Sequence, residues 1–461
     1  VEGVARSRYQ TVSRFMQELE KTIQDPSVYA GEMYLELHRG TLTNQHEIKR
    51  NNRKAEIALH DLEAALVIDA VRRHTPASEE TVTPLLGKLL VRQFHDILPG
   101  TCIHSVHEEA RHTVSQVIED ARRETEALLP AAPARNSVSL FNTLSFDRED
   151  TVYLTTDAAG AEGHSSQPFV DLDGQPTLAV SGVQLPALGA AAVSLTDQPC
   201  TAPSPFKVTD RTVSTPFMDV VFDEQGAIAS LTDRRNGRQL VDGMPFNAFL
   251  MTEDVPASYD NWDLDADTED KYRRVGQLLS RQIIADGAVE LRIRSKYRIS
   301  DKSTLVQDMV FDARRPMITF DTVMDWQEEH RFLKAAFDTT LHCDGVRSEI
   351  QFGHIRRSNH RSTDVEKARF EVCNHKYSDL SETSYGIALL NDCKYGLSAK
   401  EGSMRLSLHK GGMRPDRAGD KGRHVCRYAL LVHDAPFGAE SVIRPAYQFN
   451  YVPVAQDGVL N

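Results

Sequence analysis

The sequence changes character at residues 131–136, AAPARN, and this change limits the folds that the chain can adopt. Before it, apolar residues recur every three or four positions, which is the period of an amphipathic helix. After it, short runs rich in Val, Thr, Leu and Phe alternate with Gly, Pro, Asp and Asn, as in antiparallel strands and their turns. We therefore expect a helical part followed by a β part, not a parallel sheet with crossover helices.

The helical part contains four amphipathic segments. They cover residues 9–23, about 45–73, a stretch that carries Leu85 to Ile97, and about 105–129. Either Ser78 or Thr83 could cap the third segment, Thr83 with Pro84 at the first helical position. The last three segments are joined by short loops and predict an antiparallel three-helix bundle.

The β part begins at Ser137 and continues to the last residue, Asn461. Its many short strands favour one large antiparallel sandwich, or two stacked smaller ones, and we interpret residues 157–177 and 197–206 as surface loops. The predicted fold class is therefore multidomain α+β. We divide the chain into residues 1–33, a bundle over 34–131, and a β-sandwich region over 137–461 that could hold two sub-domains.

Composition excludes several classes of function. Lys and Arg number 53 against 66 Asp and Glu, a net charge of −13, which argues against a nucleic-acid partner because duplex binding needs a basic face. No run approaches the roughly 20 apolar residues that span a bilayer, so we expect no membrane partner. The six cysteines are scattered without a close pair, which favours a reducing, cytoplasmic compartment.

Two motifs that resemble metal sites fail on spacing. The histidines of HEEARH, His107 and His112, are five apart, whereas a helical zinc-protease motif needs them four apart. We interpret His104 and His107 as part of a solvated helix start. The acidic run Asp260–Asp270 lacks the Gly and the bidentate Glu of a calcium hairpin. It could instead form a solvated loop, or an acidic rim beside a polyhydroxyl ligand with Trp262 as a stacking surface.

The most informative stretch is QFHDILPG, residues 93–100, where His95 and Asp96 adjoin among apolar neighbours just before a Pro-Gly break. A charged pair there must be paired, solvated or bound to metal. One histidine cannot build a zinc site, which needs three or four N, O or S ligands. From the residues alone, a surface or capping pair and a metal-binding pair both remain open.

QFHDILPGTCI resembles the HD motif of glycoside hydrolase family 38, the retaining α-mannosidases. Further stretches are similar to the family in the same order along the chain: Tyr34–Glu56, Asn261–Asp265 (NWDLD), His330–Phe337, Phe370–Glu382, Tyr385–Gly396 and Met404–Asp416. The resemblance implies a zinc-dependent enzyme that hydrolyses α-mannosidic bonds of mannose-containing oligosaccharides, and bacterial relatives suggest a homodimer.

The resemblance also implies roles for individual residues. His95 would be one zinc ligand, and Asp96 would accept hydrogen bonds from mannose hydroxyls. Trp262, Asp263 and Asp265 would lie in a loop facing the sugar pocket, and residues 409–424 would form another.

Most of the family's catalytic barrel has no counterpart in this sequence. Residues 1–33 resemble the C-terminal end of that barrel domain. The nucleophile and the remaining zinc ligands would lie in a preceding region of roughly 200 to 300 residues. Glu36 is the candidate acid/base, or a carboxylate bridged to Arg39. The resemblance therefore predicts that this chain is the C-terminal portion of an α-mannosidase and that it is inactive alone.

Two other classes of function stay open. The chain could be a non-catalytic carbohydrate-binding or interaction module with the same β fold. It could also belong to a glycosidase or lyase of another family with a similar sandwich.

Overall fold

The computed structural model describes residues 3, 6–129, 131–132, 134 and 136–460, and the chain divides into two units, Val1–Leu35 and Glu36–Asn461. In its described residues, the smaller unit contains one helix, α1 (Val12–Thr22), which confirms the helix predicted over residues 9–23. Thr11 caps it by accepting a hydrogen bond from the Arg14 amide. None of the residues of α1 is buried.

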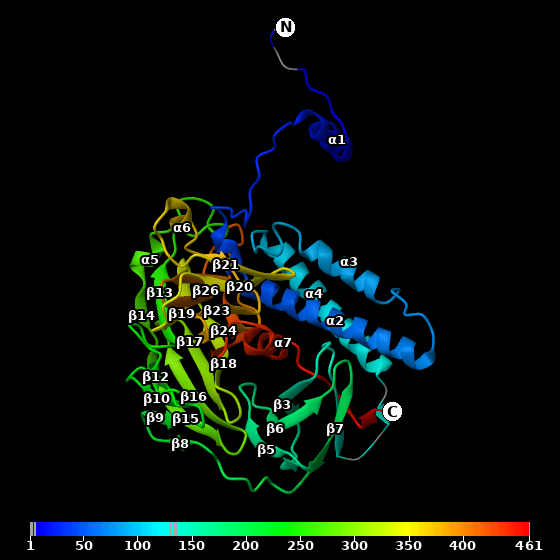
Figure 1. The fold of residues 1–461 in the computed structure, drawn as a ribbon, viewed down its shortest axis with the longest axis vertical. Coiled ribbons are helices and arrows are strands. Elements are labelled where there is room, and N and C mark those ends of the chain that lie inside the picture. Colours follow the sequence, from blue (N-terminus) through cyan, green and yellow to red (C-terminus); the bar gives the residue numbers. More distant parts are fainter. Residues whose placement is uncertain (1–2, 4–5, 130, 133, 135, 461) are drawn as a thin grey trace. The chain divides into compact units, whose positions relative to one another are not determined.

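The larger unit begins with a three-helix bundle, in which α2 (His46–Arg73), α3 (Val82–Arg92) and α4 (His104–Leu128) lie side by side (Figure 1). Its core is made of apolar side chains from all three helices: Ala55, Ala58, Leu59, Leu62, Val82, Leu85, Leu89, Val114, Val117 and Ala121. The structure confirms the predicted three-helix bundle. The bounds of α3 differ, because the helix ends at Arg92 and not at Ile97, and Thr81 is the residue before its first turn. Neither Ser78 nor Thr83 is therefore its N-cap.

A small sandwich follows the bundle. Its four-stranded sheet has the order β28 (Val454–Asp457), β2 (Ser137–Phe141), β7 (Ala190–Thr196) and β4 (Gly160–Ala161). Its three-stranded sheet has the order β3 (Arg148–Thr155), β6 (Pro176–Leu185) and β5 (Ser165–Val170). The interpretation of residues 157–177 as a loop was wrong, because β5 pairs along β6 and so uses the backbone groups of that segment.

Two larger sheets form the main sandwich, all of whose strand pairs are antiparallel. The nine-stranded sheet has the order β15 (Gln277–Asp286), β16 (Glu290–Arg298), β17 (Thr304–Asp312), β18 (Met317–Trp326), β27 (Gly422–His433), β24 (Gly386–Asn391), β23 (Tyr377–Ser381), β20 (Val346–Ile350) and β21 (Gly353–Arg357). The six-stranded sheet has the order β14 (Arg273–Val275), β13 (Ala248–Glu253), β19 (Arg331–Asp338), β26 (Ser403–Lys410), β25 (Gly396–Lys400) and β22 (Val372–Cys373).

Buried aromatic rings join the two larger sheets. Phe337 of β19 lies 6.1 Å from Phe320 of β18 and 6.5 Å from Tyr428 of β27, measured between ring centroids. All three side chains are fully buried. Such edge-to-face contacts add to the large apolar area that aromatic residues bury. The predicted class, an α+β chain with a large antiparallel sandwich after a helix bundle, is therefore confirmed.

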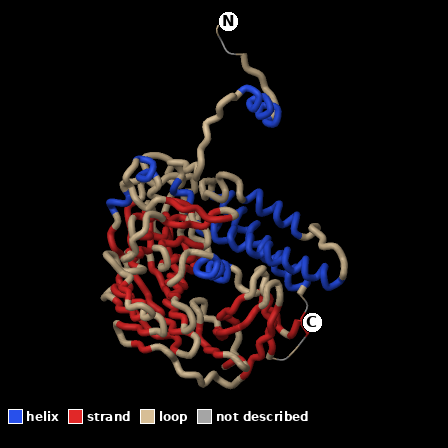
Figure 2. The backbone as a smooth tube through the Cα atoms, in the orientation of Figure 1, coloured by secondary structure: helices blue, strands red, loops and turns tan. Residues whose placement is uncertain are grey.

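Smaller elements complete the unit, and Figure 2 shows that strands dominate it outside the bundle. A five-stranded sheet has the order β12 (Arg238–Gln239), β11 (Ile228–Asp233), β10 (Met218–Phe222), β9 (Thr212–Ser214) and β8 (Lys207–Val208), and β1 (Ala131–Ala132) pairs with β29 (Val459–Leu460). The short helices are η1 (Arg39–Leu42), α5 (Thr268–Lys271), α6 (Asp364–Ala368), η2 (Ala439–Ile443) and α7 (Arg444–Asn450). Among the residues described, no helix has the length and apolar character needed to cross a membrane.

One buried ion pair ties the ends of two strands of the six-stranded sheet together. Lys410 ends β26 and donates to Asp254, which directly follows β13, and both side chains are 0% exposed. Burial raises the pKa of Asp254, although Lys410 opposes this. The pair therefore holds the chain at the start of the segment after Lys410, residues 411–421, which leads into β27.

Replacing Lys410 with Met should destabilise the protein by about 3–5 kcal/mol, because it leaves Asp254 buried without a counter-charge. The matched control is Lys421→Met, since Lys421 pairs with Glu329 at the surface and its loss should cost less than about 1 kcal/mol. Urea unfolding of both variants measures the difference. Equal midpoints for the two variants would contradict a structural role for the buried pair.

Candidate functional site

His95 and Asp96 lie in a turn that follows α3, and both side chains reach solvent. The His95 side chain is 75% exposed and that of Asp96 is 45% exposed, with 3.5 Å between His95 Nε2 and Asp96 Oδ2. Thr101 fixes Asp96, since its hydroxyl donates to Asp96 Oδ1 (2.8 Å) and its amide to the Asp96 carbonyl (3.0 Å). The imidazole of His95 is thus held on an ordered turn and remains accessible to a ligand.

A buried lysine holds the rest of this turn, which we call the HD loop (residues 93–103). Lys49 of α2 donates from Nζ to the carbonyls of Leu98 (3.1 Å) and Pro99 (3.2 Å) and to both oxygens of Asn44 (2.7 and 3.0 Å). Burial lowers the pKa of Lys49 to about 7. Four acceptors around one amine fix the loop against the first turn of α2.

The second predicted site segment, NWDLD, packs directly on the HD loop. Asn261 is fully buried and donates from Nδ2 to the Gly100 carbonyl (3.0 Å), while Asn44 donates to the Asn261 carbonyl (2.5 Å). Gly100 has φ +77°, and a Cβ there would lie 2.6 Å from Asn44 Oδ1. Only glycine combines that backbone conformation with so close an approach. The structure therefore brings together two motifs that are separated by more than 150 positions in the sequence.

The other residues predicted in NWDLD make local contacts. Asp265 Oδ2 accepts a hydrogen bond from the Ala257 amide (2.9 Å), and Asp263 Oδ1 accepts one from the Leu264 amide (3.1 Å). The Trp262 ring is partly exposed and meets the Tyr259 ring edge-on, with 6.3 Å between centroids. Each of the three side chains is thus positioned by its own loop.

The segment 411–421 approaches the same place from the β part. Asp416 accepts hydrogen bonds from His107 Nδ1 (2.9 Å) and His104 Nδ1 (3.2 Å) on α4. Burial alone would raise the pKa of Asp416, but the hydrogen bonds from His107, from the Ala418 amide and from His104 outweigh it, and the pKa is lowered. His107 is fully buried, so our interpretation of it as part of a solvated helix start was wrong. Its partner lies 309 positions away, which no local pattern reveals.

Beneath this segment, His409, Asp420 and His424 form the group of possible metal ligands found among the described residues, with ligand atoms within 4.8 Å of one another. His409 Nε2 lies 3.0 Å from Asp420 Oδ2, and His424 Nε2 lies 2.8 Å from the Asp420 carbonyl. His46 joins them, since its amide donates to Asp420 Oδ2 (2.7 Å).

Charge and burial make this group a structural cluster. Lys394 Nζ lies 3.0 Å from His46 Nδ1, so an ammonium group already sits beside the histidines and would repel a bound cation. All members are at most 8% exposed, which leaves no open position for a sugar. Burial, with the charges of His409 and Lys394, lowers the pKa of His424 to about 4. Burial likewise lowers the pKa of His46.

Glu36, the candidate acid/base, is exposed on the segment that precedes η1. Nearby, the Arg39 guanidinium donates to the Ala368 carbonyl (2.8 and 3.2 Å) and lies 4.5 Å from the centroid of Phe370. These contacts anchor η1 to the β part.

Sequence reasoning missed the residues that hold this site together, namely Lys49, Asn44 and Asp420. Each is a polar residue with at least one partner 49 or more positions away, so no periodicity marks it. The one local signal for this packing was Gly100, which follows Pro99 in the Pro-Gly break expected to end the helix.

Replacing Lys49 with Met should free the HD loop, because the Leu98 and Pro99 carbonyls lose their donor. Amide hydrogen exchange in residues 96–101 should accelerate. The free energy of unfolding should fall by about 1–3 kcal/mol. The exposed Lys88 of α3 provides the control variant Lys88→Met, which should behave as wild type. Unchanged exchange in Lys49→Met would show that the lysine does not order the loop.

The buried histidines should make the protein sensitive to acid. The folded state, with the pKa of His424 near 4, binds fewer protons than the unfolded chain between pH 6.5 and 4. Stability should therefore fall as pH decreases through this window, by on the order of 3 kcal/mol from His424, and His46 should act in the same direction. In His424→Gln this pH dependence should be shallower. Urea midpoints from pH 7 to pH 4.5 measure it, with exposed His112→Gln as control; identical slopes would contradict the assignment.

Comparisons with known proteins bear on this site. Residues 213–418 match the family model described as "Glycosyl hydrolases family 38 C-terminal domain", and residues 36–131 match "Alpha mannosidase middle domain". Human alpha-mannosidase 2C1 is 33% identical over 98% of this chain and 43% of its own length. An alpha-mannosidase of Saccharomyces cerevisiae is 28% identical over 96% of this chain and 39% of its own length. The chain thus spans less than half the length of these relatives.

The fold is also similar to solved structures. An alpha-mannosidase from Enterococcus faecalis V583 superposes with a TM-score of 0.76, covering 97% of this chain and 62% of that one at 12% identity. A protein in the glycosyl hydrolase family 38 from the same species gives a TM-score of 0.74 at 12% identity, covering 98% of this chain and 64% of that one. At this identity the two structures support the fold. The matched middle and C-terminal domains, which together cover more than half of the sequence, show that the chain belongs to glycoside hydrolase family 38.

Proposed function

We propose that this chain supplies one side of the active site of a retaining, zinc-dependent α-mannosidase. In this proposal His95 is a zinc ligand, and Asp96 accepts hydrogen bonds from mannose hydroxyls. The nucleophile and the remaining zinc ligands lie outside these 461 residues, so the chain alone is inactive. The observation that carries the proposal is the accessible His95–Asp96 pair on a loop that buried contacts hold rigid.

The surroundings of the pair support a contact with another folded part. Phe94 and Ile103, near the two ends of the HD loop, expose 61% and 58% of their surface, and Tyr259 in the neighbouring segment exposes 69%. Apolar groups exposed beside a polar ligand pair are typical of a surface that another domain covers. Such a domain would also exclude water from the sugar.

The donor set fits one part of a zinc site. Zinc takes three or four N, O or S ligands, and His95 offers one accessible imidazole. When bound, the ion would hold adjacent hydroxyls of the sugar ring and supply Lewis-acid chemistry. Asp96, fixed through Thr101, would orient the same ring by accepting from its hydroxyls.

The chemistry then follows the two-carboxylate scheme of retaining glycosidases. One carboxylate attacks the anomeric carbon, and a second, about 5 to 5.5 Å away, protonates the leaving oxygen and later activates water. We propose Glu36 for the second role, because it is exposed at the start of the larger unit. Trp262, Asp263 and Asp265 are proposed to line the sugar pocket, since their segment contacts the HD loop through Asn261.

Further proposals concern the whole protein. Residues 1–33 are proposed to be the end of a catalytic barrel. The support is that α1 exposes three apolar residues, Val12 (74%), Phe15 (49%) and Met16 (55%). An exposed apolar helix face is expected where the surface that covers it belongs to another part of the protein. Cys102, Cys200, Cys343, Cys393 and Cys426 are free thiols, which supports a reducing, cytoplasmic compartment. The protein is proposed to act as a homodimer on mannose-containing oligosaccharides.

The decisive variant is His95→Ala in the protein extended to include its catalytic region. Release of mannose from an aryl α-mannoside should fall at least about 100-fold, and the zinc content measured by mass spectrometry should fall with it, because a ligand is lost. The exposed His112 of α4 gives the control His112→Ala, which should keep both activity and zinc. Full activity and zinc content in His95→Ala would reject the assignment.

A further inference from the structure

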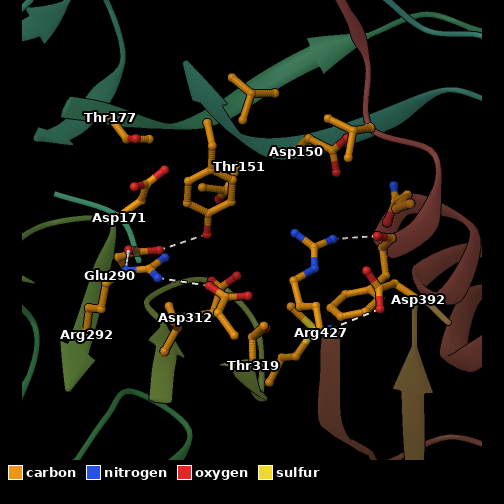
Figure 3. Close-up of a pocket in the computed structure, with 18 of the residues that line it drawn as sticks. Asp150, Thr151, Asp171, Thr177, Glu290, Arg292, Asp312, Thr319, Asp392 and Arg427 are labelled. Atoms are coloured by element: carbon orange, nitrogen blue, oxygen red, sulfur yellow. Dashed lines mark hydrogen bonds and ion pairs between the residues drawn. The ribbon is translucent and has the colours of Figure 1, made fainter. Parts of the chain in front are cut away.

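A polar cavity lies away from the HD loop, between the small sandwich and the nine-stranded sheet. Its volume is about 420 Å³, within the range of roughly 300–1,000 Å³ typical of small-molecule sites. Figure 3 shows Asp150, Thr151 and Thr177 from β3 and β6 on one side, facing Glu290, Arg292 and Thr319 from β16 and β18. Asp392 and Arg427 close one end.

Paired charges surround this cavity. Arg148 Nη2 lies 2.5 Å from Asp150 Oδ2, and Arg292 Nε lies 2.8 Å from Glu290 Oε1. Three further pairs lie in the wall: Arg292 Nη1 with Asp321 Oδ2 at 2.9 Å, Arg315 with Asp312 at 3.1 Å, and Lys54 with Asp392 at 3.0 Å. Basic donors and carboxylate acceptors therefore surround one small volume.

Some of these groups have unused hydrogen-bonding capacity. Arg148 and Asp150 are 4% and 7% exposed, and Arg148 Nε, Arg148 Nη2 and Asp150 Oδ2 make no hydrogen bond to the described residues. Arg148 Nη2 and Asp150 Oδ2 pair only with each other, and Arg148 Nε takes no part in that ion pair. Buried polar groups usually find hydrogen-bond partners, so this wall is suited to a polar ligand or to water.

Aromatic rings form another part of the wall. Tyr153 donates from its hydroxyl to Glu290 Oε2 (2.8 Å), and its ring meets Phe169 edge-on with 6.1 Å between centroids. Although that hydroxyl contacts the buried Glu290, Tyr153 remains 41% exposed, and the residue lines the cavity. A partly accessible aromatic ring beside hydrogen-bonding groups suits a ligand with both C–H faces and hydroxyls.

The charge balance indicates what kind of ligand fits. Basic side chains of the wall are Lys54, Arg148, Arg292, Arg315 and Arg427, and acidic ones are Asp150, Asp171, Asp173, Glu290, Asp312, Asp321 and Asp392. An anion would meet a surplus of carboxylates, and a cation would have to compete with guanidinium groups that already hold them. Hydroxyl groups donate and accept at once, so a neutral polyol can bind without breaking any pair.

We propose that this cavity binds a neutral pyranose of monosaccharide size, at a site separate from the HD loop. The carboxylates accept from its hydroxyls, the guanidinium groups donate to them, and Tyr153 contacts the face of the ring. This inference uses no residue of the proposed catalytic site, and it stands whether or not His95 binds zinc.

The test is ligand-observed NMR on the 461-residue chain with D-mannose, D-glucose and D-galactose as separate probes. At least one should show saturation transfer, with an affinity in the millimolar range, and D-glucuronate should bind more weakly because of the excess carboxylates. The cavity-filling variant Thr319→Phe should weaken binding at least about tenfold while it leaves the ion pairs of the wall in place. Thr319 suits this purpose because it shares its face of β18 with Met317 and Asp321, which also line the cavity.

Two controls separate the cavity from the proposed active site. Tyr153→Phe keeps the ring but removes the hydroxyl that contacts Glu290, and it should weaken binding less than Thr319→Phe. His95→Ala should leave binding unchanged. The proposal is overturned if none of the three sugars binds at up to about 100 mM. Binding that survives Thr319→Phe, or that is lost in His95→Ala, overturns it too. A failure of the α-mannosidase assignment would instead appear as His95→Ala that retains hydrolysis and zinc.

Discussion

The structure of the larger unit depends on one carboxylate, Asp420, which caps a helix from far along the chain. The residue before α2, Gln45, has a left-handed backbone and makes no side-chain cap. Asp420 takes over that role, because its Oδ2 accepts from the His46 amide at 2.7 Å. A negative charge at this end also interacts favourably with the helix dipole. The bundle and the main sandwich therefore meet through a hydrogen bond at a helix end.

Other buried charges are arranged around the same junction. Lys49 donates hydrogen bonds to carbonyls of the HD loop, and Lys410 forms an ion pair with Asp254. Asp416 accepts hydrogen bonds from His104 and His107 of α4. Buried charges are costly unless they are paired, so each fixes one geometry. By contrast, His95 and Asp96 lie at the surface of this network. The proposed function would require this arrangement, in which buried contacts hold the loop and His95 and Asp96 stay accessible.

How far the sequence predicts this arrangement depends on the range of the contacts. The buried stripe of α4 followed the helical period at Ala110, Val114 and Val117, because packing within a bundle repeats along the helix. The prediction failed at His107, where the same face meets Asp416 of the β part. The strand β5 was missed because its run, Ser165–Val170, contains a proline and few apolar residues, and only pairing with β6 makes it a strand.

The candidate site divides in the same way. His95, Asp96 and the NWDLD segment could be named from their residues and their resemblance to a family, but their proximity could not. Asn261 reaches Gly100 across 161 positions, and periodicity carries no information over that distance. The charged cavity beside Tyr153 had no sequence signal either, since its lining comes from strands of two separate sandwiches and from α2 and α7.

The distant cap of α2 has a consequence for biosynthesis. His46 and Asp420 are separated by 374 positions, so the helix leaves the ribosome long before its cap is made. At about 5–20 residues per second, the delay is roughly 20 to 75 seconds. During that interval the first turn of α2 has no carboxylate at its end, and Lys394, a neighbour of His46, is also still to be synthesised. The first helix of the bundle is therefore among the last elements to be completed.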